Sequence, residues 1–147
     1  MGFFILIPNK YLRYLRLDLD FVQDNQSVSK KGVLRGLHFQ SGDFAQAKLV
    51  RVIYGEVMDV VVDLRPESPT FKKVYKVLLS DKNLKQLFIP QGFAHGFITL
   101  SDTSVFSYKC DRFYYPGSES GVIYNDPDLA IDWSFPENEL ILSEKRH

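Results

Sequence analysis

Most of this chain is a succession of short runs rich in β-branched, leucine and aromatic residues, separated by glycine, proline and polar turn residues. Runs of about four to eight such residues predict β-strands. A helical spacing of apolar residues occurs only at residues 9–17. Many short strands with few helices favour one all-β domain over residues 1–147, either a sandwich or a jelly roll. The expected strands are residues 32–40, 48–54, 56–65, 74–80, 86–90, 95–101 and 104–110.

The charge balance and the cysteine content limit the function classes. Eighteen basic residues match eighteen acidic ones, which argues against a broad nucleic-acid interface. Cys110 is the only cysteine, so we expect no internal disulfide and a reducing, cytoplasmic location. The apolar start at residues 1–8 lacks the basic region of a signal peptide, and no apolar run approaches the roughly 20 residues that span a bilayer. The sequence predicts a soluble protein without membrane or nucleic-acid partners.

Residues 32–40, GVLRGLHFQ, carry two polar side chains in an otherwise apolar strand. Strict alternation along a strand puts Arg35 and His38 on opposite faces. If both contact one ligand, a bulge or kink near Gly36 must re-aim one of them, and a glycine inside a strand is typical of such a place. The alternative is that Arg35 reaches the ligand of a neighbouring subunit.

The titratable residues of the predicted strands favour acid–base chemistry. His38 and His95 could line one pocket with apolar walls, where pKa values are commonly tuned. Two histidines with Glu56 could instead hold a metal, but the chain has no H-x-H pattern to favour such a site. The remaining chemistry uses His38 as base, Tyr108 as acid and Lys48 as charge stabiliser. From the pattern alone, a structural role for Tyr108 and Lys48 stays the simpler interpretation.

Six motifs follow one another along the chain, at residues 21–40, 45–65, 68–71, 87–97, 108–110 and 125–133. In this order they resemble the dTDP-4-dehydrorhamnose 3,5-epimerase family, and the resemblance covers about residues 21–145. Several long motifs in one order are far more specific than a single short pattern. The resemblance implies a cupin-type jelly roll, a double-stranded β-helix with short peripheral helices, that acts as a homodimer without a cofactor or a metal.

This resemblance also implies a reaction and a set of site residues. The family inverts dTDP-4-keto-6-deoxy-D-glucose at carbons 3 and 5 in dTDP-L-rhamnose biosynthesis. A proton next to a ketone is acidic because the carbanion delocalises as an enolate, so the reaction needs a base, an acid and a group that stabilises the enolate oxygen. By resemblance these are His38, Tyr108 and Lys48, in that order. The substrate contacts implied in the same way are Gln23, Asp24, Asn25, Arg35 at the diphosphate, His95, Glu119 and Lys145.

Both ends of the chain depart from the family pattern. The N-terminus is shortened relative to the family, so Met1 stands for an arginine and Leu6 for a substrate-binding glutamate. Arg146 replaces an aspartate that orients the catalytic histidine, and a positive group there disfavours protonated His38. Three hypotheses follow: an active 3,5-epimerase in which another acid such as Asp59 supports His38, a nucleotide-sugar-binding relative that has lost turnover, and a truncated version of an active enzyme. An alternative function is that of a mono-epimerase acting at carbon 3 or 5 of a related deoxysugar.

Overall fold

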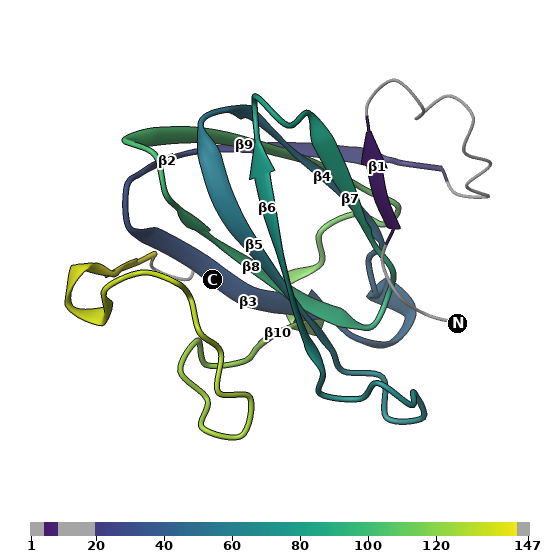
Figure 1. Cartoon of the computed structure of the whole chain (residues 1–147). Coiled ribbons are helices and arrows are strands. Elements are labelled where there is room, and N and C mark those ends of the chain that lie inside the picture. The colour runs from purple at the N-terminus through teal and green to yellow at the C-terminus, as the bar shows by residue number, and fades with distance from the viewer. Residues whose placement is uncertain (1–4, 9–19, 144–147) are drawn as a thin grey trace.

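The computed structural model describes residues 5–8, by their backbone alone, and residues 20–143. Two sheets lie face to face (Figure 1). The first sheet has the strand order β1-β7-β4-β9-β2, and the second has the order β10-β3-β8-β5-β6 with β11 paired to β3. The elements are β1 (Ile5–Pro8), β2 (Gln23–Lys30), β3 (Val33–Gln40), η2 (Gly42–Phe44), β4 (Lys48–Tyr54), β5 (Glu56–Asp63), β6 (Val74–Ser80), β7 (Lys85–Ile89), β8 (Phe93–Thr99), β9 (Thr103–Cys110), η3 (Pro116–Ser118), β10 (Glu119–Gly121), η4 (Glu137–Glu139) and β11 (Ile141–Leu142).

The all-β prediction is confirmed, and every strand expected from the sequence is present within about two residues of its predicted ends. The sequence did not predict β2, which pairs with β9 along its whole length. β2 is an edge strand with one exposed face, so it tolerates polar residues. Its sequence QDNQSVSK therefore lacks the apolar pattern by which the other strands were predicted. The helix expected at residues 9–17 lies outside the described residues. Among the residues that the structure describes, no helix has the length and apolar character needed to cross a membrane.

The inner faces of the two sheets pack together into the main core. This core joins valines and leucines of β4, β5, β6 and β7 to an aromatic group formed by Phe93, Phe97 and Phe106. Phe97 of the second sheet stacks on Phe106 of the first at 4.1 Å between ring centroids. Burying such aromatic side chains supplies much of the free energy that holds two sheets together. Phe97 and Phe106 also line the cavity described below.

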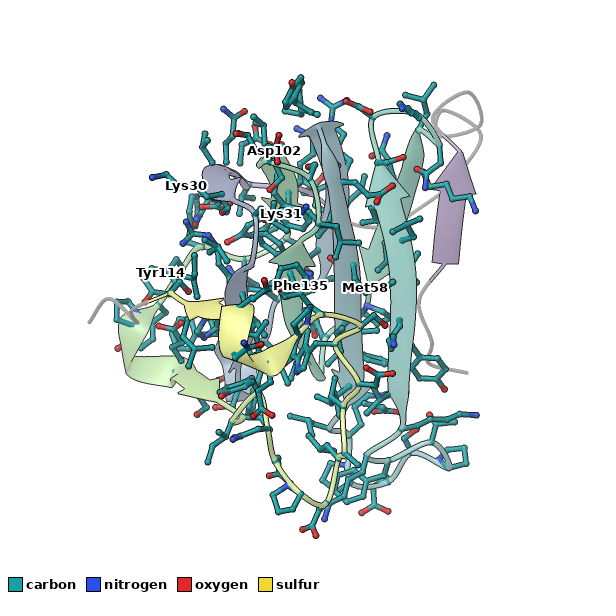
Figure 2. The ribbon with its side chains drawn as sticks, turned by 60° about the vertical axis from the view of Figure 1, so that its left-hand side comes forward. Lys30, Lys31, Met58, Asp102, Tyr114 and Phe135 are labelled. Atoms are coloured by element: carbon teal, nitrogen blue, oxygen red, sulfur yellow. The ribbon has the colours of Figure 1, made fainter. Side chains whose placement is uncertain are left out.

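The C-terminal segment covers the outer face of the second sheet. Trp133 is 6% exposed and packs there with Leu37, Val60 and Ile98. Figure 2 shows Met58 and Phe135 in this region, where the yellow segment crosses the sheet. Because both faces of the second sheet are covered, β8 is buried along its whole length, as its nearly continuous apolar sequence requires. The strands that carry His38 and His95 are therefore held from both sides.

The strand register shifts by one residue between Arg35 and His38. Arg35 pairs with Phe97 whereas His38 pairs with His95, so three steps along β3 match two along β8. Gly36 lies in this bulge with a φ of +124°, and a Cβ placed on it would lie 2.5 Å from the Cα of Gly96. The predicted bulge near Gly36 is confirmed, and it turns Arg35 and His38 toward the same cavity.

Replacing Gly36 by alanine is expected to lower the free energy of unfolding by about 2–3 kcal/mol, because both its φ and the contact with Gly96 exclude a Cβ. Urea denaturation followed by the fluorescence of Trp133 measures this change. Gly42→Ala is the matched control: its φ is +65° but no atom lies within 4 Å of the added Cβ, so the cost is about 1 kcal/mol. Equal losses in the two variants would show that the close approach is unimportant.

Candidate active site

A cavity of about 390 Å³ opens between the two sheets. Its walls come from the inner faces of β2, β4 and β9 on one side and of β3, β8 and β10 on the other. Its lining combines aromatic rings with polar side chains, a composition typical of ligand sites. Most residues predicted for the site line this cavity, namely Gln23, Asn25, Arg35, His38, Lys48, His95, Tyr108 and Glu119.

His38 faces a carboxylate across the edge of the second sheet. Its Nδ1 lies 3.6 Å from Oε1 of Glu119, and the side chains are 35% and 15% exposed. Glu119 starts β10, the strand paired with the second half of β3. A carboxylate at this distance favours the protonated imidazole, so His38 has an acidic partner within the described residues.

His95 has a different and more deeply buried partner. Its Nε2 lies 2.8 Å from Oδ2 of Asp59, whose side chain is fully buried on the neighbouring strand β5. Burial raises the pKa of Asp59, and the contact with His95 opposes that rise. The hypothesis that Asp59 supports His38 is therefore corrected: its carboxylate is directed to His95, and Glu119 is the acid beside His38.

Lys48 and Tyr108 lie on the opposite sheet, on β4 and β9. The Lys48 ammonium is 5.4 Å from the centre of the Tyr108 ring. Burial lowers the pKa of Lys48, while Cys110, Asp59 and Glu119 oppose this effect. Burial also raises the pKa of Tyr108 to about 12. The Tyr108 hydroxyl is therefore protonated at neutral pH and can donate a proton.

Polar side chains near the rim are tied to their neighbours by hydrogen bonds. Arg35 donates from Nε to the hydroxyl of Ser29, 2.9 Å away, and Ser29 is buried. Gln23 donates to Oδ1 of Asn25 at 2.9 Å, and Asn25 donates to the sulfur of Cys110 at 3.7 Å. These bonds pre-orient side chains that the resemblance assigns to substrate binding, with Arg35 at the diphosphate.

Two predicted contacts are not among the described residues that line the cavity. Asp24 points to the outer face of the first sheet, where its carboxylate pairs with Lys109 at 2.7 Å and is 73% exposed. Lys145 lies outside the described residues, and so do Met1, Arg146 and the side chain of Leu6. The roles assigned to Asp24 and Lys145 stay predictions.

The sequence did not point to several cavity residues. Phe106 is two residues before Tyr108 on β9, so alternation along the strand could have placed it on the same face. Tyr114 comes from the segment after β9 and had no such signal. Gln40 ties that segment to β3, because its Oε1 accepts from the backbone of Tyr115 at 2.8 Å.

The structure separates Glu56 from the two histidines that could have held a metal ion with it. Glu56 lies with Asp81 and Ser101 in a separate hollow, whereas His38 and His95 line the cavity between the sheets. Across the described ranges, 5–8 and 20–143, no three His, Cys, Asp or Glu side chains are grouped closely enough to hold a metal ion. The set of two histidines and Glu56 is therefore not assembled.

Comparisons with known proteins agree on one family. Residues 2–147 match the family model described as dTDP-4-dehydrorhamnose 3,5-epimerase. A relative of that name from Escherichia coli (strain K12) is 52% identical over 147 residues, which cover 98% of this chain and 78% of the relative.

Solved structures give the same result. The dTDP-4-dehydrorhamnose 3,5-epimerase from Elizabethkingia anophelis is 59% identical with a TM-score of 0.84, over 85% of this chain and 68% of that one. A Legionella pneumophila dTDP-6-deoxy-D-glucose-3,5-epimerase, solved in complex with dTDP-4-keto-L-rhamnose, is 52% identical with a TM-score of 0.84, over 91% of this chain and 70% of that one. The two sheets form the cupin-type jelly roll that the motifs predicted. This chain belongs to the dTDP-4-dehydrorhamnose 3,5-epimerase family.

Proposed function

We propose that this protein epimerises dTDP-4-keto-6-deoxy-D-glucose at carbons 3 and 5 through an enolate, in dTDP-L-rhamnose biosynthesis. The proposal rests on the finding that His38 and Tyr108 line one cavity from opposite sheets, with Lys48 beside Tyr108 on the first sheet. Inversion of a carbon needs a base on one face and an acid on the other. A sugar ring lying between the sheets meets both requirements.

Each inversion breaks one C–H bond and forms another. His38 takes the proton next to the ketone, and the electron pair of that bond delocalises onto the carbonyl oxygen. The Lys48 ammonium balances the negative charge on this oxygen. Tyr108 then gives its hydroxyl proton to the opposite face of the carbon, and both residues return to their starting states by exchange with solvent. The raised pKa of Tyr108, about 12, keeps this proton in place until the enolate forms.

The diphosphate of the substrate is complementary in charge to Arg35, which lines the cavity. The guanidinium of Arg35 is held by Ser29 at 2.9 Å, and guanidinium geometry suits a diphosphate. We assign Gln23, Asn25 and Glu119 to the nucleotide and the sugar hydroxyls. We assign His95, which is paired with Asp59, to the sugar near the reacting carbons. We also propose that the protein is a homodimer, as the family resemblance implies. We propose a cytoplasmic location because the chain has a single cysteine.

Incubation with dTDP-4-keto-6-deoxy-D-glucose in deuterated water tests this function. Proton NMR is expected to show solvent deuterium entering carbons 3 and 5, with formation of the inverted sugar. Exchange at only one carbon would identify a mono-epimerase. Binding of the substrate with no exchange at either carbon would identify a nucleotide-sugar-binding relative and overturn the proposal.

A further inference from the structure

The two oxygens of the Glu119 carboxylate contact two different residues. Oε2 accepts a hydrogen bond from the hydroxyl of Tyr114 at 2.5 Å, while Oε1 lies 3.6 Å from Nδ1 of His38. Figure 2 labels Tyr114 beside β10, the strand that Glu119 begins. One carboxylate thus links an aromatic hydroxyl to the histidine that we assign as the base.

The backbone around Tyr114 is fixed by side chains from the strands below it. The amide of Tyr114 donates to Oε1 of Gln23 at 2.8 Å. The next amide, of Tyr115, donates to Oε1 of the buried Gln40 at 2.8 Å. The ring of Tyr115 also stacks on Phe44 at 4.1 Å between centroids. The Tyr114 side chain is half exposed. Its hydroxyl nevertheless contacts Glu119 from a segment whose backbone is fixed by these hydrogen bonds.

This arrangement has a defined electrostatic effect on His38. A hydrogen bond from a hydroxyl stabilises a carboxylate in its charged form and fixes its direction, and the pKa of Tyr114 is raised chiefly by this same bond. The carboxylate in turn favours the imidazolium that forms when His38 takes a proton. Among the residues that the structure describes, the other charged or titratable groups lining this cavity are Arg35 of β3, His95 of β8, Lys48 of β4 and Tyr108 of β9. None of these four is a carboxylate.

We propose that Tyr114 is a positioning residue of this site, which holds Glu119 so that its second oxygen stays directed at His38. The proposal deepens the function proposed above, in which His38 is the base, and adds a residue that acts on the base through a carboxylate. Removing the Tyr114 hydroxyl frees Glu119 to turn away, so the protonated form of His38 loses the contribution of this carboxylate.

Titration of the His38 imidazole by NMR tests the proposal without any turnover. The signal of His38 is assigned with the His38→Gln variant, and its titration midpoint is followed with pH. Tyr114→Phe and Glu119→Gln are both expected to move the midpoint to lower pH, by about half to one pH unit for one screened charge about 4 Å away. Tyr115→Phe is the matched control, because that ring packs on Phe44, and it leaves the midpoint in place.

A double-mutant cycle makes the test specific. If Tyr114 acts through Glu119, the Tyr114→Phe/Glu119→Gln variant has the same midpoint as Glu119→Gln alone. A wild-type midpoint in Tyr114→Phe, or additive shifts in the double variant, would overturn the proposal. Thermal unfolding of each variant checks that the fold is retained.

The kinetic readout separates this proposal from the proposed function. In Tyr114→Phe, kcat for solvent exchange is expected to fall about tenfold, with the acid limb of the pH profile shifted to lower pH. KM is expected to rise as well, because Glu119 is also assigned to the substrate. A rise in KM with unchanged kcat would assign Tyr114 to substrate binding instead. If the wild-type protein shows no exchange, the proposed function fails, whereas the NMR cycle still decides whether Tyr114 acts on His38.

Discussion

Replacing His38 by glutamine is expected to lower the rate of solvent exchange at carbons 3 and 5 by about a thousandfold, the size typical of a lost general base. Glutamine keeps the size and polarity of the position but cannot accept the substrate proton at neutral pH. The affinity for dTDP is expected to stay nearly unchanged, because the nucleotide contacts assigned above belong to other residues. Proton NMR in deuterated water gives the rate, and calorimetry with dTDP gives the affinity.

Stability provides the control for this variant. The His38 side chain is 35% exposed, so its replacement is expected to change the free energy of unfolding by less than about 1 kcal/mol. A folded His38→Gln protein that exchanges both protons at the wild-type rate would remove His38 from its role as base. Loss of dTDP affinity in parallel with exchange would assign it to binding instead.

Replacing Tyr108 by phenylalanine is expected to separate exchange from inversion. His38 still takes the substrate proton and can return solvent deuterium to the same face, so exchange continues with retained configuration. Inversion needs a donor on the opposite sheet, and its rate is expected to fall by about 10²–10⁴. NMR analysis of the recovered sugar therefore shows deuterium at the reacting carbons without the inverted product.

Tyr75 offers a matched control for that experiment. It packs against the same core from β6 and is not among the side chains that line the described cavity. Tyr75→Phe is expected to invert the substrate at the wild-type rate. If Tyr108→Phe also inverts at the wild-type rate, another residue is the acid.

The arrangement of Arg35 and His38 could be predicted from local rules. A strand alternates its side chains, and a glycine between two polar residues marks a place where the alternation can be broken. The one-residue register shift at Gly36 confirms this interpretation. These rules act within one strand and its nearest neighbour, so the sequence of β3 contains most of the information they need.

The partners of the two histidines could not be predicted in this way. Asp59 and His95 are 36 residues apart and meet because β5 and β8 are neighbours in the second sheet. Glu119 reaches His38 only because β10 pairs with β3, and Tyr114 reaches Glu119 through a segment fixed by Gln40 and Gln23. Such contacts depend on the registers of strands distant in the chain, which local patterns do not specify.

In the proposed reaction His38 removes the proton from each reacting carbon, and Tyr108 supplies a different proton from the opposite sheet. A single-turnover reaction of wild-type protein in deuterated water tests this mechanism most directly, with mass spectrometry and NMR of the first inverted product. Because His38 removes the substrate proton and Tyr108 supplies a solvent-derived one, complete deuterium content is expected at every inverted carbon. Substrate hydrogen retained at an inverted carbon would show that one residue carries the proton from face to face. That result would contradict a mechanism in which His38 and Tyr108 act on opposite faces.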